Sequence, residues 1–325
     1  MRDMIDNFKD DSIVSYPIKV VMINSFGKKE KGEDDGGLLR DALSAFWSEF
    51  YDSCTVGEDE RVPVVRHDFK EKEWEAIARI LVKGYQDVKF FPVKLNKVFL
   101  FATLFDSRDV PEEMLLNSFL KYVSKDERDL IERALKDELD ESQDDEWMEF
   151  LERFECRTVP TKAKRKTVIL ELAHKEMVQI AQYIIDSWQK PVKDHLIGYD
   201  CFTSKESFDK FYESCKPTVK KVLSMIKAKP ENNSQRAALS YLQRYIRGLD
   251  DEKLTKFLRF CTSATMLCVE SIKVTFTDLD GVARRPVAHT CGAVLELPTT
   301  YQSFPQFRQE INAIFSSEYW DIDIA

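Results

Sequence analysis

The sequence contains no run of about 20 apolar residues, which is the length that a membrane-spanning helix needs. Its start, MRDMIDNFKDD, lacks the apolar core of a secretory signal. The sequence also has no excess of positive charge, since 57 acidic residues outnumber 48 basic ones and leave a net charge of −9. A chain with this charge repels phosphate backbones. We therefore expect no nucleic-acid partner, no membrane partner and an intracellular location, in the cytoplasm or alternatively in the nucleus.

The cysteines form no C-x-x-C pair, and their number is odd. This pattern fits neither a disulfide framework nor a zinc site, so we expect reduced thiols, no metal and no cofactor. Any of the seven is then a candidate nucleophile. They are Cys54, Cys156, Cys201, Cys215, Cys261, Cys268 and Cys291.

Hydrophobic periodicity predicts a mostly helical first part. The apolar residues of 38–51 recur at helical spacing, which indicates an amphipathic helix after the glycine-containing, charged loop 26–37. The apolar run 18–23 predicts a buried strand. Further helices are predicted over 72–86, 112–139, 171–189 and 205–227.

Two charged stretches interrupt this part. The acidic stretch 137–146 carries too much like charge to pack, so we expect a solvated connection. The basic run 162–166 predicts an exposed loop, with a role in nuclear import or in binding an acidic partner as the alternative.

A change of pattern follows the segment KPENNS at 229–234, where proline and asparagines disfavour both helix and strand. Downstream we predict an α+β arrangement with a turn at Asp280-Gly281 and a last helix from near Ser303. The other predicted elements are helices over 235–247 and 251–260 and strands over 271–278 and 293–297. The sequence thus predicts a larger helical part followed by a small α+β part.

Cys291 differs from the other six cysteines, which lie inside helical or apolar patterns. It lies in the segment RPVAHTCGAVLELP, between Pro286 and the strand predicted at 293–297. Gly292 leaves one flank of the thiol uncrowded, and such a loop is expected at the surface. The alternative is a small apolar side chain at the entrance of a strand.

Three strings along the chain resemble the HECT family of ubiquitin-protein ligases, in the family's order, from about residue 17 to the end. The segment 286–291, with Leu295-Glu296-Leu297-Pro298 and Tyr301, resembles its catalytic loop. Phe260-Cys261-Thr262 resembles a shorter family motif. The glycine-rich entrance to the family's larger lobe is matched by Glu30, Gly32, Asp34, Gly36, Gly37, Arg40 and Asp41.

The resemblance implies a two-lobed α+β architecture with a hinge near Pro230. It divides the chain into an extension at 1–16, an N-lobe at 17–229 and a C-lobe at 230–325. It also implies a ubiquitin-protein ligase that carries ubiquitin as a thioester on Cys291. The implied partners are ubiquitin, a ubiquitin-conjugating enzyme, expected to dock in the region 110–230, and a protein substrate.

The chain departs from the family pattern at several positions. Ser263 replaces a glycine, Arg285 a leucine and Gly292 a phenylalanine, and Thr299-Thr300 inserts one residue before Tyr301. Where the family favours a phenylalanine near the C-terminus, this chain has Tyr319 and Trp320. The alternative function is therefore an inactive HECT-like module that binds partners of the ubiquitin pathway.

Few side chains beside Cys291 are candidates for assisting the chemistry. His289 is a candidate for activating the thiol, and Thr290 for hydrogen bonding to the loop or to the tetrahedral intermediate. Asp321 and Asp323 are candidates for receiving the proton of the lysine amine.

Two other kinds of site are disfavoured. A cysteine hydrolase would need an oriented histidine base, but all four histidines precede Cys291, and none is marked as that base by the sequence. The acidic, glycine-containing segment 30–41 lacks the spacing of a calcium loop or a phosphate-binding loop, so we interpret it as a turn that leads into the next helix.

Overall fold

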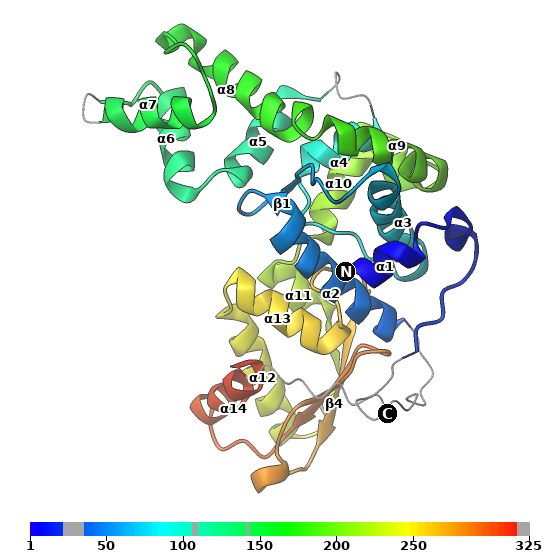
Figure 1. Cartoon of the computed structure of the whole chain (residues 1–325). Helices are drawn as coiled ribbons and strands as arrows, with labels where there is room; N and C mark the ends of the chain where they lie inside the picture. Colours follow the sequence, from blue (N-terminus) through cyan, green and yellow to red (C-terminus); the bar gives the residue numbers. More distant parts are fainter. Residues whose placement is uncertain (22–35, 106–109, 141–142, 317–325) are drawn as a thin grey trace. The chain divides into compact units, whose positions relative to one another are not determined.

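The computed structural model describes residues 1–21, 36–105, 110–140 and 143–316 (Figure 1). These residues form an α+β fold that is mainly helical, with one two-stranded and one four-stranded sheet. Their contacts define two compact units. Unit 1 comprises Met1–Asp11, Trp47–Val82 and Pro92–Tyr212, and unit 2 comprises Ser12–Phe46, Lys83–Phe91 and Glu213–Ala325.

The first two long helices confirm the predictions at 38–51 and 72–86. Each of them contributes residues to both units. The elements up to residue 104 are α1 Arg2–Asn7, a 3-10 turn Asp11–Ser15, α2 Gly37–Cys54, β1 Thr55–Val56, β2 Val62–Pro63, α3 Glu71–Val88 and α4 Lys97–Leu104. The described residues 18–21 are not in a strand, so that prediction is wrong there, while 22–23 lie outside the described residues.

The core of unit 1 surrounds α4, all of whose residues are buried. Its sequence KVFLFATL is apolar almost all round, as in a helix that is covered on every side. Phe99 of this helix packs edge-on against Trp188 with ring centroids 5.2 Å apart, and Trp188 in turn contacts Trp47. Large aromatic side chains each bury a large apolar area, so these rings contribute strongly to the core of unit 1.

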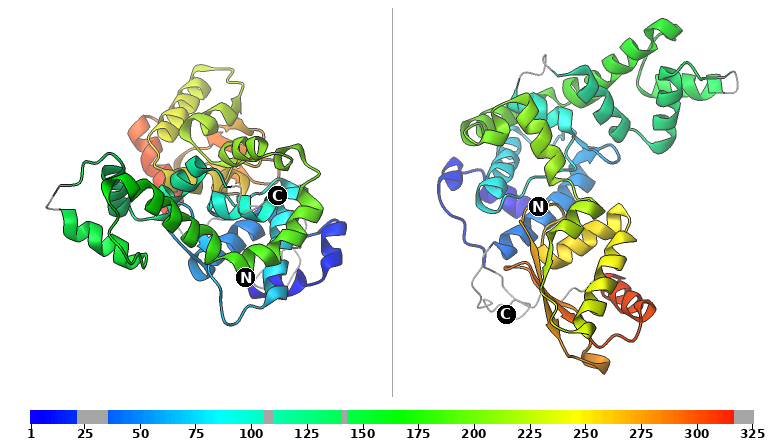
Figure 2. Two further views of the ribbon diagram at one scale, coloured as in Figure 1. Left: turned by 90° about the horizontal axis from the view of Figure 1, so that it is seen from above. Right: turned by 180° about the vertical axis from the view of Figure 1, so that it is seen from behind.

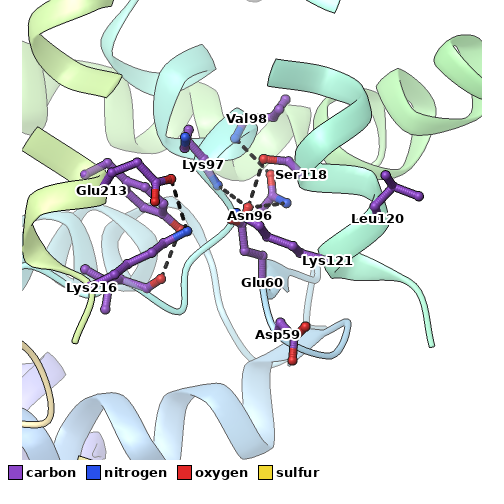
Figure 3. Close-up of polar contacts among 12 residues, drawn as sticks. Asp59, Glu60, Asn96, Lys97, Val98, Ser118, Leu120, Lys121, Glu213 and Lys216 are labelled. Atoms are coloured by element: carbon purple, nitrogen blue, oxygen red, sulfur yellow. Dashed lines mark hydrogen bonds and ion pairs between the residues drawn. The ribbon is translucent and has the colours of Figure 1, made fainter. Parts of the chain in front are cut away.

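Asn96 begins α4 and connects it to a buried carboxylate. Its side-chain oxygen accepts hydrogen bonds from the main-chain N–H groups of Val98 and Phe99, so it is an N-cap. Its side-chain nitrogen donates to Glu60, which is 1% exposed. Figure 3 shows Glu60 at the centre of these contacts, where the hydroxyl of Ser118 also donates to it at 2.9 Å.

The segment predicted as one helix at 112–139 is two helices, α5 Glu112–Tyr122 and α6 Lys125–Leu135. Ser124 separates them because it makes a capping box with Glu127, in which each side chain accepts a hydrogen bond from the main chain of the other residue. The cap fixes an extended residue that a continuous helix cannot contain.

The charged stretches are more ordered than predicted. Within the acidic stretch, α7 Asp144–Arg153 begins with acidic residues, which interact favourably with a helix N-terminus. The basic run forms a 3-10 turn and the start of α8 Arg165–His174 instead of a loop, and Arg165 pairs with Asp137 at 3.2 Å. Figures 1 and 2 show α6, α7 and α8, in green, gathered at one end of unit 1.

The segment predicted as a helix at 171–189 is continuous with α8 but changes its winding. A π-helical turn, Lys175–Gln179, lies between α8 and α9 Gln182–Leu196. A 3-10 turn, Asp200–Phe202, then leads to α10 Lys205–Cys215. The single helix predicted over 205–227 is therefore wrong, because this segment holds two helices and the start of a strand. Pro217 lies before α11 Val219–Met225, and the chain turns into a strand at Ile226.

Unit 2 is built on the four-stranded sheet, whose order is β3-β4-β6-β5. The first three strands in this order run parallel, and β5 is antiparallel to β6. The strands are β3 Ile226–Ala228, β4 Ile272–Thr277, β5 Val287–His289 and β6 Val294–Pro298. The helices α12 Asn233–Arg247, α13 Asp251–Thr262 and α14 Phe304–Ser316 confirm the predicted pattern.

One face of this sheet is covered by the helices. Alternate residues of β4 and β6, including Ile272, Val274, Leu295 and Leu297, share a buried cluster with side chains of α11, α12, α13 and α14. This alternation is what a half-buried strand requires. Since β3 pairs with β4, residues 213–229 pack within unit 2, although the sequence assigned them to the first lobe. The lobe boundaries and the hinge stay predictions.

None of the described helices is both long and apolar enough to cross a membrane. In the same parts of the chain, no three His, Cys, Asp or Glu side chains are grouped so that they could hold a metal ion.

Candidate active site

Cys291 lies at the tip of a β-hairpin in unit 2. In this hairpin, His289 of β5 pairs with Val294 of β6. The four residues between them, Thr290 to Ala293, form the turn. The main-chain N–H of Ala293 donates to the carbonyl of Thr290 at 3.4 Å, and Ala293 has a positive φ of 48°. The short strand β5 was not predicted, since three residues give too little alternation to be recognised.

The accessibility of the thiol distinguishes Cys291 from several other cysteines. Cys54, Cys215 and Cys261 are buried, and burial raises the pKa of the Cys261 thiol far above its ordinary value. Burial also raises the pKa of Cys268 to about 11, against the opposing effect of the nearby Arg40 charge. Cys291 is partly exposed and its neighbour Gly292 is exposed. A partly exposed thiol in a turn is the better candidate for a nucleophile.

The start of α2 lies directly against this thiol. A Cβ atom added to Gly37 would lie 2.8 Å from the Cys291 sulfur and 2.9 Å from the Cys291 main-chain nitrogen. Cβ atoms essentially never come this close to other heavy atoms. Glycine is therefore required at this position for the hairpin tip and the helix to approach each other as they do.

Arg40, one turn further along α2, binds the main chain of two other segments. It is 5% exposed, and its Nε donates to the carbonyl of Thr262 at 2.8 Å. Its Nη2 donates to the carbonyl of Thr290 at 2.6 Å and to that of Cys291 at 3.3 Å. The planar guanidinium thus connects the end of α13 to the turn that carries the thiol.

Two further contacts join α2 to α13. The hydroxyl of Ser44 donates to the carbonyl of Ser263 at 2.7 Å, and Asp41 pairs with Arg259 at 3.3 Å. Ser263 follows α13 in the left-handed conformation, with φ of 60°. Sequence reasoning missed Ser44, because its hydroxyl donates to a main-chain carbonyl that any residue would supply.

His289 has a partner other than the thiol. Its Nε2 lies 3.1 Å from Oε1 of Glu296, a residue of the neighbouring strand. Within the described residues, neither ring nitrogen of His289 hydrogen-bonds to Cys291. The buried Thr290 contributes its main-chain carbonyl to the Arg40 contact. Roles in catalysis for His289 and Thr290 stay predictions.

The structure brings together residues from all three strings that the sequence singled out. Gly37 and Arg40 come from the first, Thr262 from the second and Cys291 from the third. Arg40 and Cys291, which are in direct contact, lie 251 positions apart along the chain. Several predicted residues lie outside the described residues, namely Glu30, Gly32, Asp34, Tyr319, Trp320, Asp321 and Asp323.

Tyr301 packs in the core of unit 2 and is 8% exposed. Its ring contacts Phe307 of α14 with centroids 4.9 Å apart, and the guanidinium of Arg284 lies over it at 5.3 Å. Arg284 also pairs with Glu310 at 2.6 Å. Tyr301 therefore joins the segment after β6 to the last described helix, although the chain inserts one residue before it.

Comparison with known protein families identifies the same region. The sequence model described as HECT-domain (ubiquitin-transferase) matches residues 193–320, which is less than half of the chain. None of the curated proteins matches the chain. At the level of the family, this match indicates a ubiquitin transferase, a class of enzyme that interacts with conjugating enzymes, ubiquitin and substrates. The match over residues 193–320 thus supports the assignment of this part of the chain to the HECT-domain family.

Proposed function

We propose that the chain is a ubiquitin-protein ligase that accepts ubiquitin from a conjugating enzyme as a thioester on Cys291 and transfers it to substrate lysines. The observation that carries the proposal is the partly exposed Cys291 thiol at a hairpin tip, within the segment that matches the family. The main chain of this tip is held by a buried arginine. A nucleophile needs this combination of access and fixed geometry.

In the first step, the Cys291 thiolate attacks the carbonyl carbon of the thioester between ubiquitin and the conjugating enzyme. A carbon–sulfur bond to Cys291 forms, and the bond to the donor cysteine breaks. The donor leaves as a thiolate, and the proton lost by Cys291 passes to solvent. Because both sulfurs are good leaving groups, this exchange is nearly balanced in energy and depends mainly on proximity.

In the second step, a substrate lysine in its neutral amine form attacks the same carbonyl carbon. An isopeptide bond forms, and the Cys291 thiolate leaves. The amine loses a proton to a base, for which the carboxylates of Asp321 and Asp323 are the proposed candidates. Thr290 and His289 support the step by maintaining the hairpin, through the main chain of Thr290 and the contact between His289 and Glu296.

A thioester assay tests this proposal. The purified chain is incubated with ubiquitin, activating enzyme, ATP and a broad panel of conjugating enzymes, and the products are separated without reductant. We expect an adduct of chain and ubiquitin that a thiol reductant removes. Cys291→Ala should abolish it, and Cys291→Ser should give an oxyester that resists the reductant but is cleaved by hydroxide.

Cys156→Ser is the matched control, since Cys156 is also partly exposed but lies in unit 1. This variant should form the adduct as the unchanged chain does. An adduct that persists in Cys291→Ala, or no adduct with any conjugating enzyme, would contradict the proposal.

The second candidate function is a module that binds partners of the ubiquitin pathway without transferring ubiquitin. The close contact between the Cys291 sulfur and Gly37 favours it, because part of the thiol surface is covered. This candidate predicts that the Cys291→Ala variant binds ubiquitin or a charged conjugating enzyme as tightly as the unchanged chain does, and that neither forms the adduct.

A further inference from the structure

The turn that carries Cys291 has little to hold it in place by itself. Its one internal main-chain hydrogen bond among those described joins Ala293 to Thr290 and is long, at 3.4 Å. Gly292 is exposed, and Ala293 adopts a left-handed conformation that is unfavourable for a residue with a side chain. The position of the sulfur must therefore be fixed by tertiary contacts.

Arg40 supplies such a contact. Its guanidinium is buried and donates to three main-chain carbonyls, those of Thr262, Thr290 and Cys291. Hydrogen bonds from a charged donor are shorter and stronger than those between neutral groups. The carbonyls of Thr290 and Cys291 belong to the two peptide bonds on either side of Cys291, so Arg40 holds the backbone that carries the thiol.

Gly37 completes the arrangement on the same helix. Its missing side chain leaves the space in which the Cys291 sulfur and main-chain nitrogen lie. Arg40 and Gly37 lie three positions apart on α2, so they belong to one face of the first turn of that helix. The start of α2 is therefore both the surface that receives the thiol and the source of the arginine that holds it.

We propose that Arg40 is a positioning residue for Cys291, which anchors the main chain of the hairpin tip to the start of α2 with Gly37 as the close-packing surface. The positioning rests on the geometry of unit 2 alone, whereas its consequence for ubiquitin transfer rests on the proposed function. Acyl transfer is fast only when the attacking atom and the thioester carbonyl carbon are held close together in the correct orientation. Loosening the hairpin should therefore make the thiol more accessible and the transfer slower.

Alkylation of individual cysteines tests the positioning without ubiquitin. The folded full chain is exposed briefly to iodoacetamide, and modification at each cysteine is measured by peptide mass spectrometry. In Arg40→Gln, alkylation of Cys291 should rise on the order of tenfold relative to Cys156, because the charged hydrogen bonds to its turn are lost. Arg40→Lys keeps the charge but not the fork of donors, and should give an intermediate rise.

Two glycine variants form a matched pair. Gly37→Ala should raise the alkylation of Cys291 in the same way as Arg40→Gln, since the new methyl group displaces the hairpin. Gly198→Ala should leave it unchanged, because a Cβ atom at Gly198 meets nothing within 4 Å. The fully buried Cys261 lies in the core of the same unit and should stay protected in all four variants.

Two results would overturn the inference. One is unchanged alkylation of Cys291 in both Arg40→Gln and Gly37→Ala. The other is a parallel rise at Cys291 and Cys261, which would mean that Arg40 only stabilises the unit as a whole.

Discharge of a preformed Cys291 thioester to free lysine should slow by roughly tenfold or more in Arg40→Gln.

If the unchanged chain forms no thioester while Arg40→Gln still exposes Cys291 selectively, the positioning is supported and the proposed function fails. The two ideas are thus separated by the same set of proteins.

Discussion

The residue that ends α13 is held in an unfavourable backbone conformation. Ser263 has φ of 60° and is 2% exposed, and its main-chain N–H donates to the carbonyl of Arg259 at 2.8 Å. A left-handed residue closes many helices, and glycine is the usual one because it has no Cβ atom to collide with the backbone. Here the residue is a serine, and its main-chain carbonyl accepts a hydrogen bond from the hydroxyl of Ser44.

We expect Ser263→Gly to stabilise the protein by up to about 1 kcal/mol, because it removes the strain of a side chain at positive φ. The measurement is the free energy of unfolding in urea. As a control, Ser240→Gly replaces an exposed serine inside α12 and should destabilise by about 0.5 kcal/mol. Equal losses of stability in the two variants would contradict the interpretation of Ser263.

Residues of the candidate site differ in how well the sequence predicts them. Cys291 was recognisable because its neighbours follow a family pattern. The contacts of Arg40 were not, since they go to main-chain carbonyls 222 to 251 positions away and carry no side-chain signature. The partner of His289, Glu296, was also missed, because β5 was not predicted and the register of the hairpin was therefore unknown.

The element at the centre of unit 1, helix α4, depends on the buried carboxylate of Glu60. This side chain accepts hydrogen bonds from Ser118 at 2.9 Å and from the main chain of Lys97 at 3.1 Å, and Lys121 lies 3.3 Å from it (Figure 3). The Glu60 carboxylate thus links the first residue of α4, Lys97, to the residues Ser118 and Lys121 of α5. Removing one member of a buried charged network is costly because the remaining members lose their partner.

We expect Glu60→Ala to destabilise the protein by about 3–5 kcal/mol, because several buried donors lose a charged acceptor. The adjacent Asp59 is the control, since its side chain is 64% exposed and pairs with Arg128 at the surface. Asp59→Ala should cost less than about 1 kcal/mol. Urea unfolding followed by tryptophan fluorescence measures both, and similar losses would show that burial of Glu60 has no special effect.

The π-helical turn between α8 and α9 contains a second carboxylate of interest. Burial raises the pKa of Glu176 above its ordinary value of 4.5, and the hydrogen bond from Tyr122 and the charge of Lys175 oppose this only in part. The folded protein therefore binds this proton more tightly than the unfolded chain does. The resulting contribution to stability is full below pH 4.5 and is lost as the pH rises through the pKa of the folded state.

We expect Glu176→Gln to lose less stability than the unchanged protein between pH 4.5 and neutrality. Glutamine keeps an acceptor for Tyr122 but has no charge to bury. Glu155→Gln is the contrasting variant, because its hydrogen bond with Lys175 lowers the pKa of Glu155. That stabilisation is present above pH 4.5 and is lost as the pH falls. Thermal unfolding measured on both sides of pH 4.5, from acid pH to neutrality, separates the two signs.

For the chain as a whole, long amphipathic helices could be predicted and short elements could not. The helices at 38–51, 72–86, 235–247 and 251–260 have enough turns for their apolar spacing to be distinctive. Strands of three residues, the capping box at Ser124 and the π-helical turn are decided by hydrogen bonds that periodicity does not report.

The division into compact units also could not be read from composition. The lobe boundary predicted at the asparagine-rich segment near 232 stays a prediction. In the structure, Asn232 is the N-cap of α12 and accepts a hydrogen bond from the main chain of Gln235. The strand β3 before it belongs to the same sheet as β4. The pairing of β3 with β4 thus places residues before this polar segment in unit 2, and that pairing is not visible in the composition.

Because β3 is an edge strand of its sheet, it determines where a carboxyl-terminal fragment of the protein can begin. Residues Ile226–Ala228 of β3 pair in parallel with β4, along the edge of β4 that faces away from β6. A protein fragment begun at Pro230 would leave the N–H and C=O groups of β4 open along that side. Open ladders of this kind recruit other chains and promote aggregation. A soluble carboxyl-terminal fragment should therefore begin upstream of α11, so that the ladder stays closed.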